Sequence, residues 1–109
     1  MQVDLLRGTL DMLVLKALTG GALHGYGIAR WLEAVTADAL RVEEGSLYPA
    51  LRRLMERGWV RAEWGVSENN RRARYYTLTR RGRTQLQREV AAWERFQVVV
   101  GEVLNVPES

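Results

Sequence analysis

The sequence predicts a mainly α-helical fold that contains one small β-hairpin and ends in a long C-terminal helix. Apolar residues recur at helical spacing in four segments, and two short stretches rich in Trp, Tyr and Thr lie between the third and fourth segments. The 109 residues, 47% of them hydrophobic, match one small domain with one core. We therefore expect three helices, a hairpin and a final helix, in that order.

The first two helices are expected over residues 5–19 and 25–36. The first is apolar on more than one side, and the face with Met12 and Leu15 exceeds what a single core needs. We expect this face to pack against a second element or a second subunit. In the second helix the residues expected to point inward are Tyr26, Ile28, Ala29, Leu32 and Val35.

The third helix is expected to begin at Ser46, a good N-cap, and to end at Gly58. Pro49 then falls in the first turn, where a missing N–H is tolerated. The apolar residues that would face the core are Leu47, Leu51, Leu54 and Met55. The exposed face, which is half basic, is left with Tyr48, Arg52, Arg53 and Glu56.

The hairpin is expected to consist of strands at 59–64 and 74–79, joined by a polar tip at 65–73 that is too long for a two-residue turn. Three helices followed by a hairpin that can reach past the third helix form a winged helix-turn-helix. Thr79 is expected to cap the final helix. The expected division is a winged helix-turn-helix domain at 1–79, a dimerisation helix at 80–106 and a frayed tail at 107–109.

The final helix carries an apolar stripe with steps of three and four residues. The stripe consists of Leu86, Val90, Trp93, Phe96, Val100 and Val103. The first three helices offer it no partner, so we expect a second copy of the chain to cover it. The expected homodimer interface contains Met12, Leu15, Leu86, Val90, Trp93, Val100 and Val103.

Positive charge is concentrated in one part of the chain. Residues 52–83 contain ten Arg and three Glu, a charge of +7, whereas the whole chain carries only +3. A local positive field on one supersecondary unit favours a polyanion. The alternative is that these arginines only form a solvated surface, because the chain contains fifteen Arg and one Lys. For any single Arg this alternative has about even odds, but for the whole cluster it is disfavoured.

In a helix-turn-helix the second helix of the pair enters the major groove of DNA, and neighbouring cations neutralise phosphates. On the third helix these roles fall to Ser46, Tyr48, Pro49, Arg52 and Arg53. Whether Arg52 and Arg53 read bases or hold phosphates stays open. The wing residues suited to the backbone or the minor groove are Asn69, Asn70, Arg71, Arg72 and Arg74, and those at the entry of the second helix are His24 and Tyr26.

Other chemistries are weakly represented. A stacking platform for single-stranded nucleic acid could be formed by the aromatic residues Trp59, Trp64, Tyr75 and Tyr76. Packing of these side chains across neighbouring strands is the better interpretation. The single histidine and the absence of cysteine argue against a metal site, a disulfide or a thiolate. The side chains of the adjacent residues Glu43 and Glu44 are expected to point in different directions, so this pair predicts no acid–base catalysis. We expect no enzyme, no cofactor, no membrane contact and a cytoplasmic location.

The sequence resembles the PadR-type transcriptional regulators. The resemblance covers about residues 5–100 and rests on Leu23-His24-Gly25-Tyr26-Gly27-Ile28, on Glu43-Glu44-Gly45-Ser46-Leu47-Tyr48-Pro49-Ala50-Leu51, on Leu54, Gly58 and Trp59, and on Trp64-Gly65 with Arg72-Ala73-Arg74-Tyr75-Tyr76-Thr77-Leu78-Thr79 and Gly82. It implies a bacterial repressor that dimerises through its last helix, aided by the first. The chain resembles the compact branch of the family; in the multidrug-sensing members of that branch, a Trp on the last helix helps to wall a flat pocket at the dimer centre where aromatic ligands stack.

From the resemblance, Trp93 stands at the matching position for such an effector site, and we add Phe96 as a possible second wall from its spacing. The function expected is that of a homodimeric repressor on double-stranded DNA with an inverted-repeat operator, with an aromatic effector as an option. The alternative is a winged-helix module that binds an acidic protein without specific DNA binding. The operator, the regulated genes and the sign of regulation are not encoded in any pattern of this sequence.

Overall fold

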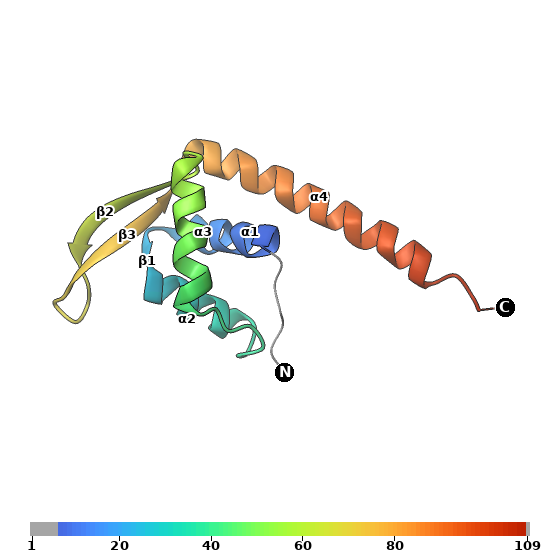
Figure 1. The fold of residues 1–109 in the computed structure, drawn as a ribbon, viewed down its shortest axis with the longest axis horizontal. Coiled ribbons are helices and arrows are strands. Elements are labelled where there is room, and N and C mark those ends of the chain that lie inside the picture. The colour runs from blue at the N-terminus through green and yellow to red at the C-terminus, as the bar shows by residue number, and fades with distance from the viewer. Residues whose placement is uncertain (1–6, 109) are drawn as a thin grey trace.

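The computed structural model describes residues 7–108 and contains four α-helices and a three-stranded sheet within that range. The elements are α1 (Arg7–Ala17), a 3₁₀ turn η1 (Leu18–Gly20), β1 (Leu23–His24), α2 (Gly25–Val35), α3 (Glu44–Glu56), β2 (Val60–Val66), β3 (Arg72–Leu78) and α4 (Arg80–Leu104). Figure 1 shows the first three helices and the sheet gathered at one end, with α4 extending away from them. The predicted fold class is confirmed.

Two predicted boundaries reach beyond the described residues. The expected start of the first helix at residue 5 lies outside them, and so does Ser109 of the expected tail. The last described residues, Pro107 and Glu108, follow the end of α4 without regular structure.

The core is formed where α1, α2 and α3 pack against one another and against the base of the sheet. Its fully buried side chains are Val14, Leu15, Leu18, Ile28, Leu32, Leu47, Leu51 and Leu54. Those on α3 recur at steps of four and three residues, so they form the single inward stripe that the sequence predicted. At the start of α4, Leu86 is also buried, and Val90 packs against this core.

Two residues of α2 differ from the prediction. Ile28 and Leu32 point inward as expected, but Tyr26 is 70% exposed and Val35 is 58% exposed. They occupy the second and last positions of the helix, where the axis leaves the core behind. Tyr26 is therefore free to contribute to a surface site.

The start of α3 was predicted wrongly. The helix begins after Glu43, whose side chain makes no capping hydrogen bond, and Ser46 lies inside the first turn with its backbone N–H donating to Glu43 at 3.0 Å. Pro49 consequently lies in the second turn rather than the first, and its ring removes the bond to the carbonyl of Gly45. Gly45 is exposed, so water can satisfy that carbonyl.

The predicted end of α3 is confirmed. Gly58 has a φ of +76°, and its N–H donates to Met55 while the next N–H, of Trp59, donates to Leu54, each at 3.0 Å. This pair of bonds around a left-handed residue is the Schellman arrangement, which favours glycine at that position.

The sheet has the strand order β1-β3-β2, and both pairings are antiparallel. β1 was not predicted, because two residues are too few to show an alternating pattern. β2 and β3 pair continuously from Val60 with Leu78 to Val66 with Arg72. The strands therefore extend further toward the tip than the predicted 59–64 and 74–79, and the loop is shorter than 65–73.

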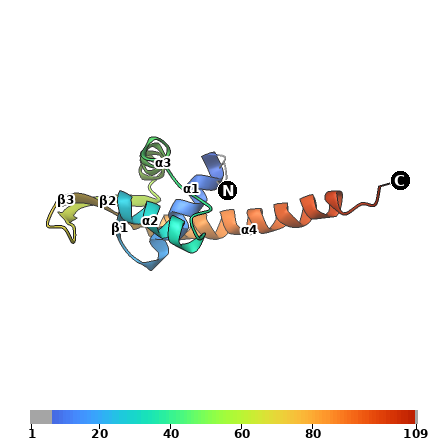
Figure 2. The ribbon, with the colours of Figure 1, turned by 90° about the horizontal axis from the view of Figure 1, so that it is seen from below.

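A tight joint connects the hairpin to α4. Thr79 accepts a hydrogen bond from the N–H of Gly82 at 3.0 Å, donates its hydroxyl proton to the carbonyl of Gly58 at 2.8 Å, and uses its own N–H for the carbonyl of Trp59. A Cβ at Gly82 would lie 2.1 Å from that Trp59 carbonyl oxygen. The predicted Thr79 cap is confirmed. Val90 packs against the core, and Figure 2 shows from below that α4 then extends away from the other elements.

Candidate nucleic-acid interface

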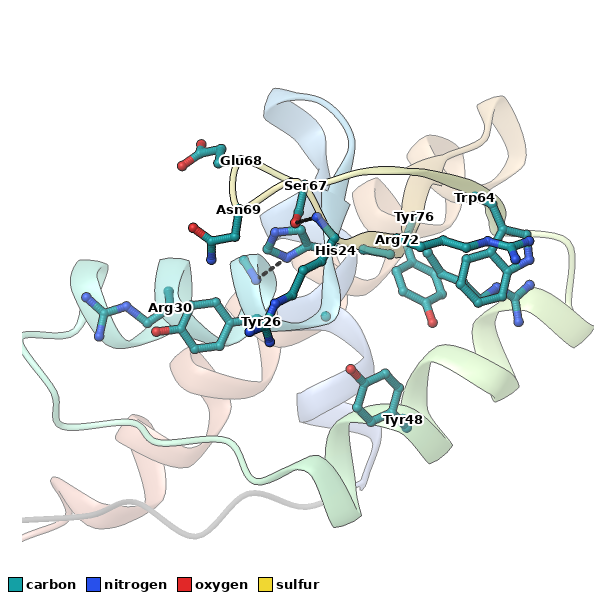
Figure 3. A pocket seen from close by; sticks show the side chains of 15 residues that line it. His24, Tyr26, Arg30, Tyr48, Trp64, Ser67, Glu68, Asn69, Arg72 and Tyr76 are labelled. Carbon is teal, nitrogen blue, oxygen red and sulfur yellow. Dashed lines mark hydrogen bonds between the residues drawn. The ribbon is translucent and has the colours of Figure 1, made fainter.

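A groove of about 700 Å³ separates the hairpin from the exposed sides of α2 and α3. Figure 3 shows it from close by, with the hairpin above, α2 at one side and α3 below. Seven of the twelve predicted DNA-binding residues line it: His24, Tyr26, Tyr48, Asn69, Arg71, Arg72 and Arg74. Three segments far apart in the sequence thus meet at one concave surface.

The wing tip is a short, hydrogen-bonded loop. The N–H of Ser67 donates to the carbonyl of Arg71 at 2.7 Å, and the N–H of Asn70 donates to the carbonyl of Ser67 at 2.9 Å. Asn70 has a φ of +58°, which is the left-handed conformation that closes a three-residue hairpin loop. Asn tolerates this conformation better than other non-glycine residues. The loop therefore holds Asn69 and Arg71 at a defined place beside the groove.

The entry of α2 forms the floor of the groove. His24 caps the helix because its Nδ1 accepts a hydrogen bond from the N–H of Gly27 at 2.9 Å, and its ring lies 5.3 Å from that of Tyr75. A Cβ at Gly25 would lie 2.6 Å from the hydroxyl of Tyr48. Glycine at this position allows α3 to approach the entry of α2, so Tyr48 faces into the groove while His24 has a capping role.

Tyr76 adds a second hydroxyl to the groove. Its ring is buried, and this burial raises the pKa of the phenol, with the charge of Arg74 lowering it and Tyr48 raising it. The phenol is therefore protonated at neutral pH and able to donate a hydrogen bond. Figure 3 shows the hydroxyls of Tyr76 and Tyr48 on facing walls of the groove.

Arg53 does not belong to this surface. Its guanidinium donates two hydrogen bonds to the carboxylate of Asp11 on α1, with nitrogen–oxygen distances of 2.6 and 3.1 Å. The side chains of Arg53 and Asp11 are only 23% and 13% exposed. The hydrogen bond to Asp11 raises the pKa of Arg53, so the charge is permanent. Two of its five N–H donors are thus engaged between α3 and α1, so the structure favours a structural role for Arg53 over the predicted DNA-contact role.

The other α3 residues predicted for DNA contact are exposed. Ser46, Pro49 and Arg52 lie on the outer side of the helix and do not line the groove. Asn70 is likewise exposed at the wing tip outside the lining. Their side chains are accessible to a molecule that covers α3 and the tip at once.

Sequence reasoning missed several residues of the groove. Arg30 of α2, and Trp64 and Tyr76 of the sheet, line it together with Ser67 and Glu68 of the loop. The register pairs Trp64 with Arg74, and alternation places both on the same sheet face as Tyr76. The sequence showed that these side chains alternate along the strands, but it did not show which face of the sheet is turned toward the groove.

Eight of the ten arginines of residues 52–83 form two groups in space, and the other two, Arg52 and Arg53, lie on α3. Arg71, Arg72 and Arg74 lie along the outer half of the hairpin, whereas the second group lies at its base, where α3 ends and α4 begins: Arg57, Arg61, Arg80, Arg81 and Arg83. Six residues of strand, about 20 Å at 3.3 Å per residue, separate the base pairing from the tip pairing. The charge that the sequence concentrates in residues 52–83 is thus spread over α3 and the two ends of the hairpin.

The distal half of α4 exposes apolar side chains. Trp93 is 39% exposed, Phe96 58% and Val103 68%, and the rings of Trp93 and Phe96 lie 6.0 Å apart. By contrast, Leu15 and Leu86 of the predicted dimer interface are already buried within one chain. Leu15 has no exposed surface and Leu86 only 7%, so we do not carry these two residues forward into the proposed interface.

Other chemistries find no support in the described residues. Within 7–108 no group of three or more His, Cys, Asp and Glu side chains is arranged to hold a metal ion. None of the described helices combines the length and apolar character that a membrane span requires.

Comparison with known proteins identifies the family. The model of the transcriptional regulator PadR-like family matches residues 14–88, which include the groove, the hairpin and the start of α4. The chain belongs to the PadR-like family of transcriptional regulators. It is therefore a DNA-binding regulator of transcription and not an enzyme, and its winged helix-turn-helix is the PadR fold.

Solved structures agree over most of the chain. A transcriptional regulator from Clostridium thermocellum is 28% identical, with a TM-score of 0.81 over 88% of this chain and 93% of that one. A PadR family regulator from Eggerthella lenta is 31% identical, with a TM-score of 0.78 over 93% and 86%. A PadR family regulator from Clostridium difficile is 26% identical, with a TM-score of 0.76 over 90% and 100%.

Proposed function

We propose that this PadR-like regulator is a homodimeric repressor that binds an inverted-repeat operator through α3 and the wing. The observation that carries the proposal is the groove between them, in which cationic and hydroxyl side chains from three elements converge. A duplex that meets this surface would place its major groove on α3 and an adjacent backbone or minor groove on the wing tip.

The residues proposed for contact follow from accessibility. On α3 they are Ser46, Tyr48, Pro49 and Arg52, and on the wing they are Asn69, Asn70, Arg71, Arg72 and Arg74. Tyr26 is open to the same ligand. Arg52 is assigned to the duplex and Arg53 is not, because Asp11 accepts two hydrogen bonds from Arg53 and holds its guanidinium against α1.

The exposed stripe of α4 supports the homodimer. Trp93, Phe96 and Val103 are exposed and Val90 and Val100 are partly buried, and all five lie within a sector of about 140° around the helix axis. A second copy that covered this stripe about a two-fold axis would present two recognition helices to the same side. The operator would then be an inverted repeat with half-sites about 10 bp apart or a multiple of it.

An aromatic effector at the dimer centre is the third part of the proposal. Trp93 and Phe96 offer neighbouring, partly exposed rings on the face that the partner would share. Such an effector would release DNA only if it binds the DNA-incompatible arrangement more tightly. Quenching of Trp fluorescence by planar aromatic compounds, present in the native protein and lost in Trp93→Leu, would test it.

Binding to DNA fragments from the region upstream of its own gene, followed by fluorescence anisotropy, tests the main proposal. The logarithm of the affinity should fall with the logarithm of the salt concentration by about 0.9 per neutralised phosphate. Replacing Arg71 and Arg72 with Ala should weaken all duplexes and reduce that slope by about two. Equal affinity for every sequence with a flat salt response would favour a protein-binding module and overturn the proposal.

A further inference from the structure

Trp64 is the most exposed aromatic side chain of the hairpin, and it lies on the face of the sheet that lines the groove. It is 59% exposed, although a Trp on a short hairpin normally gains stability by being covered. Its ring is instead covered from one side by arginine: the guanidinium carbon of Arg72 lies 4.4 Å from the ring centroid and that of Arg74 lies 5.7 Å from it.

The strand register explains this arrangement. Arg74 is the direct partner of Trp64 across the ladder, and Arg72 is the diagonal neighbour two residues closer to the tip. All three side chains lie on one face because residues separated by two share a face. Figure 3 shows Arg72 extending along the strand toward the indole of Trp64 rather than away from the protein.

From this geometry we propose that Trp64 is a positioning residue, which holds Arg72 and Arg74 in the orientation in which they bind the phosphates of DNA. The inference rests on the proposed function, since it assumes that the wing meets a duplex. Within residues 7–108 the ion pairs are those of Arg30 and Arg53, so neither wing arginine is held by a carboxylate. The indole is therefore the group that orders them.

Stacking suits this purpose because the donors of a guanidinium lie in its plane. An arginine whose flat face rests on an aromatic ring keeps its N–H groups pointing outward, where a phosphate can accept two of them. A carboxylate partner would occupy two of those donors, as Asp11 does for Arg53. The indole also reduces the side-chain entropy that the free arginine would lose on binding.

Two other roles for Trp64 make different predictions. If the indole touches a sugar or base directly, its removal weakens binding whether or not the arginines are present. If it only stabilises the hairpin, its removal changes the melting temperature and leaves the affinity of the folded protein unchanged. A positioning role predicts an effect on affinity that depends on the arginines.

The test is a double-mutant cycle with Trp64→Leu, the pair R72A/R74A, and the combination of all three, measured on one operator by fluorescence anisotropy. A cation–π contact at an exposed site implies a loss of about two- to fivefold for Trp64→Leu in the native background. In the R72A/R74A background the same change should have almost no effect. Trp64→Phe, which keeps an aromatic face, should restore most of the affinity.

A matched control uses Arg61, which lies on the other face of β2. The combination of Trp64→Leu with Arg61→Ala should be additive, because Arg61 does not approach the indole. Equal losses for Trp64→Leu in the presence and absence of the arginines would overturn the inference in favour of direct contact. No change in affinity with a lower melting temperature would overturn it in favour of a structural role.

A measurement without DNA separates this inference from the proposed function. The ring current of the indole should move the side-chain NMR signals of Arg72 upfield in the free protein, and Trp64→Leu should abolish that displacement. Arg72 signals at random-coil positions in the native protein would contradict the inference directly. A native protein that shows the displacement but binds no duplex would instead overturn the proposed function.

Discussion

Arg53 and Arg52 are adjacent in the sequence, yet the structure gives them opposite surroundings. We predict that replacing Arg53 with Leu destabilises the fold, whereas replacing Arg52 with Leu weakens DNA binding and leaves stability unchanged. Arg53 donates two short hydrogen bonds to Asp11 in a half-buried position, whereas Arg52 is exposed. The two variants remove the same charge and are therefore matched controls for each other.

The magnitude follows from what Arg53→Leu leaves behind. The carboxylate of Asp11, which is 13% exposed in the native structure, would lose both hydrogen bonds, and Glu89 would add a like charge nearby. Breaking a fully buried pair costs 3–5 kcal/mol and an exposed pair at most about 1 kcal/mol, so we expect about 2 kcal/mol here. For a domain of this size that corresponds to a lower melting temperature by about 10 °C.

Thermal unfolding at one fixed protein concentration measures the stability effect, since the melting temperature of the proposed dimer would depend on concentration. The double variant D11L/R53L removes the orphaned carboxylate as well and should recover most of the stability. In this rescued background the salt dependence of DNA binding should equal that of the native protein. A salt slope reduced by about one in D11L/R53L would show that Arg53 contacts a phosphate and would refute the reasoning.

Three further outcomes are expected. Gly82→Ala should cost at least about 3 kcal/mol, because its Cβ would overlap the Trp59 carbonyl, and chemical denaturation measures this. Val100→Asp should dissociate the dimer in sedimentation, whereas Val98→Asp, about 160° away around α4, should not. Burial raises the pKa of Glu89, a hydrogen bond with Gln85 and the charge of Arg57 lower it, and the charge of Asp11 raises it. The protonated carboxyl is therefore favoured in the folded state, so the free energy of unfolding should fall as the pH rises from 4.5, the ordinary pKa of Glu, through the higher pKa of the folded state. Glu89→Gln should then stabilise the protein by about 1 kcal/mol at neutral pH but not at pH 4.

The sequence predicted those parts of the fold that rest on local patterns. Helical spacing identified α2 and most of α3. The hairpin was predicted from two strand-like segments on either side of a polar tip. The cap at Thr79 and the stop at Gly58 were found because each is determined by its own conformational preference. The start of α3 was missed, because Ser46 is the better capping residue but the chain turns earlier, at Glu43, whose side chain makes no cap.

The site was less predictable because its roles depend on distant residues. Asp11, which holds Arg53, is 42 positions away from it, so no window around Arg53 could separate it from Arg52. The same limit applies to Leu15 and Leu86, which looked surplus until the packing of α1 against α4 was known. Exposure of Trp64 likewise depends on how far the hairpin stands from α2, which is a property of the assembled fold.

The joint at Thr79 and Gly82 has a mechanical consequence. At the start of α4, Thr79 donates hydrogen bonds to the carbonyls of Gly58 and Trp59, and Gly82 packs against the carbonyl of Trp59. These carbonyls lie where α3 ends and the hairpin begins. Gly82 is packed so closely that an added Cβ would lie 2.1 Å from the carbonyl oxygen of Trp59, and we expect such a joint to resist bending. If two copies rotate relative to each other about their α4 helices, α3 and the hairpin of each copy would move with α4 as one rigid body. A small rotation at the dimer centre would then appear as a larger displacement at the hairpin tips.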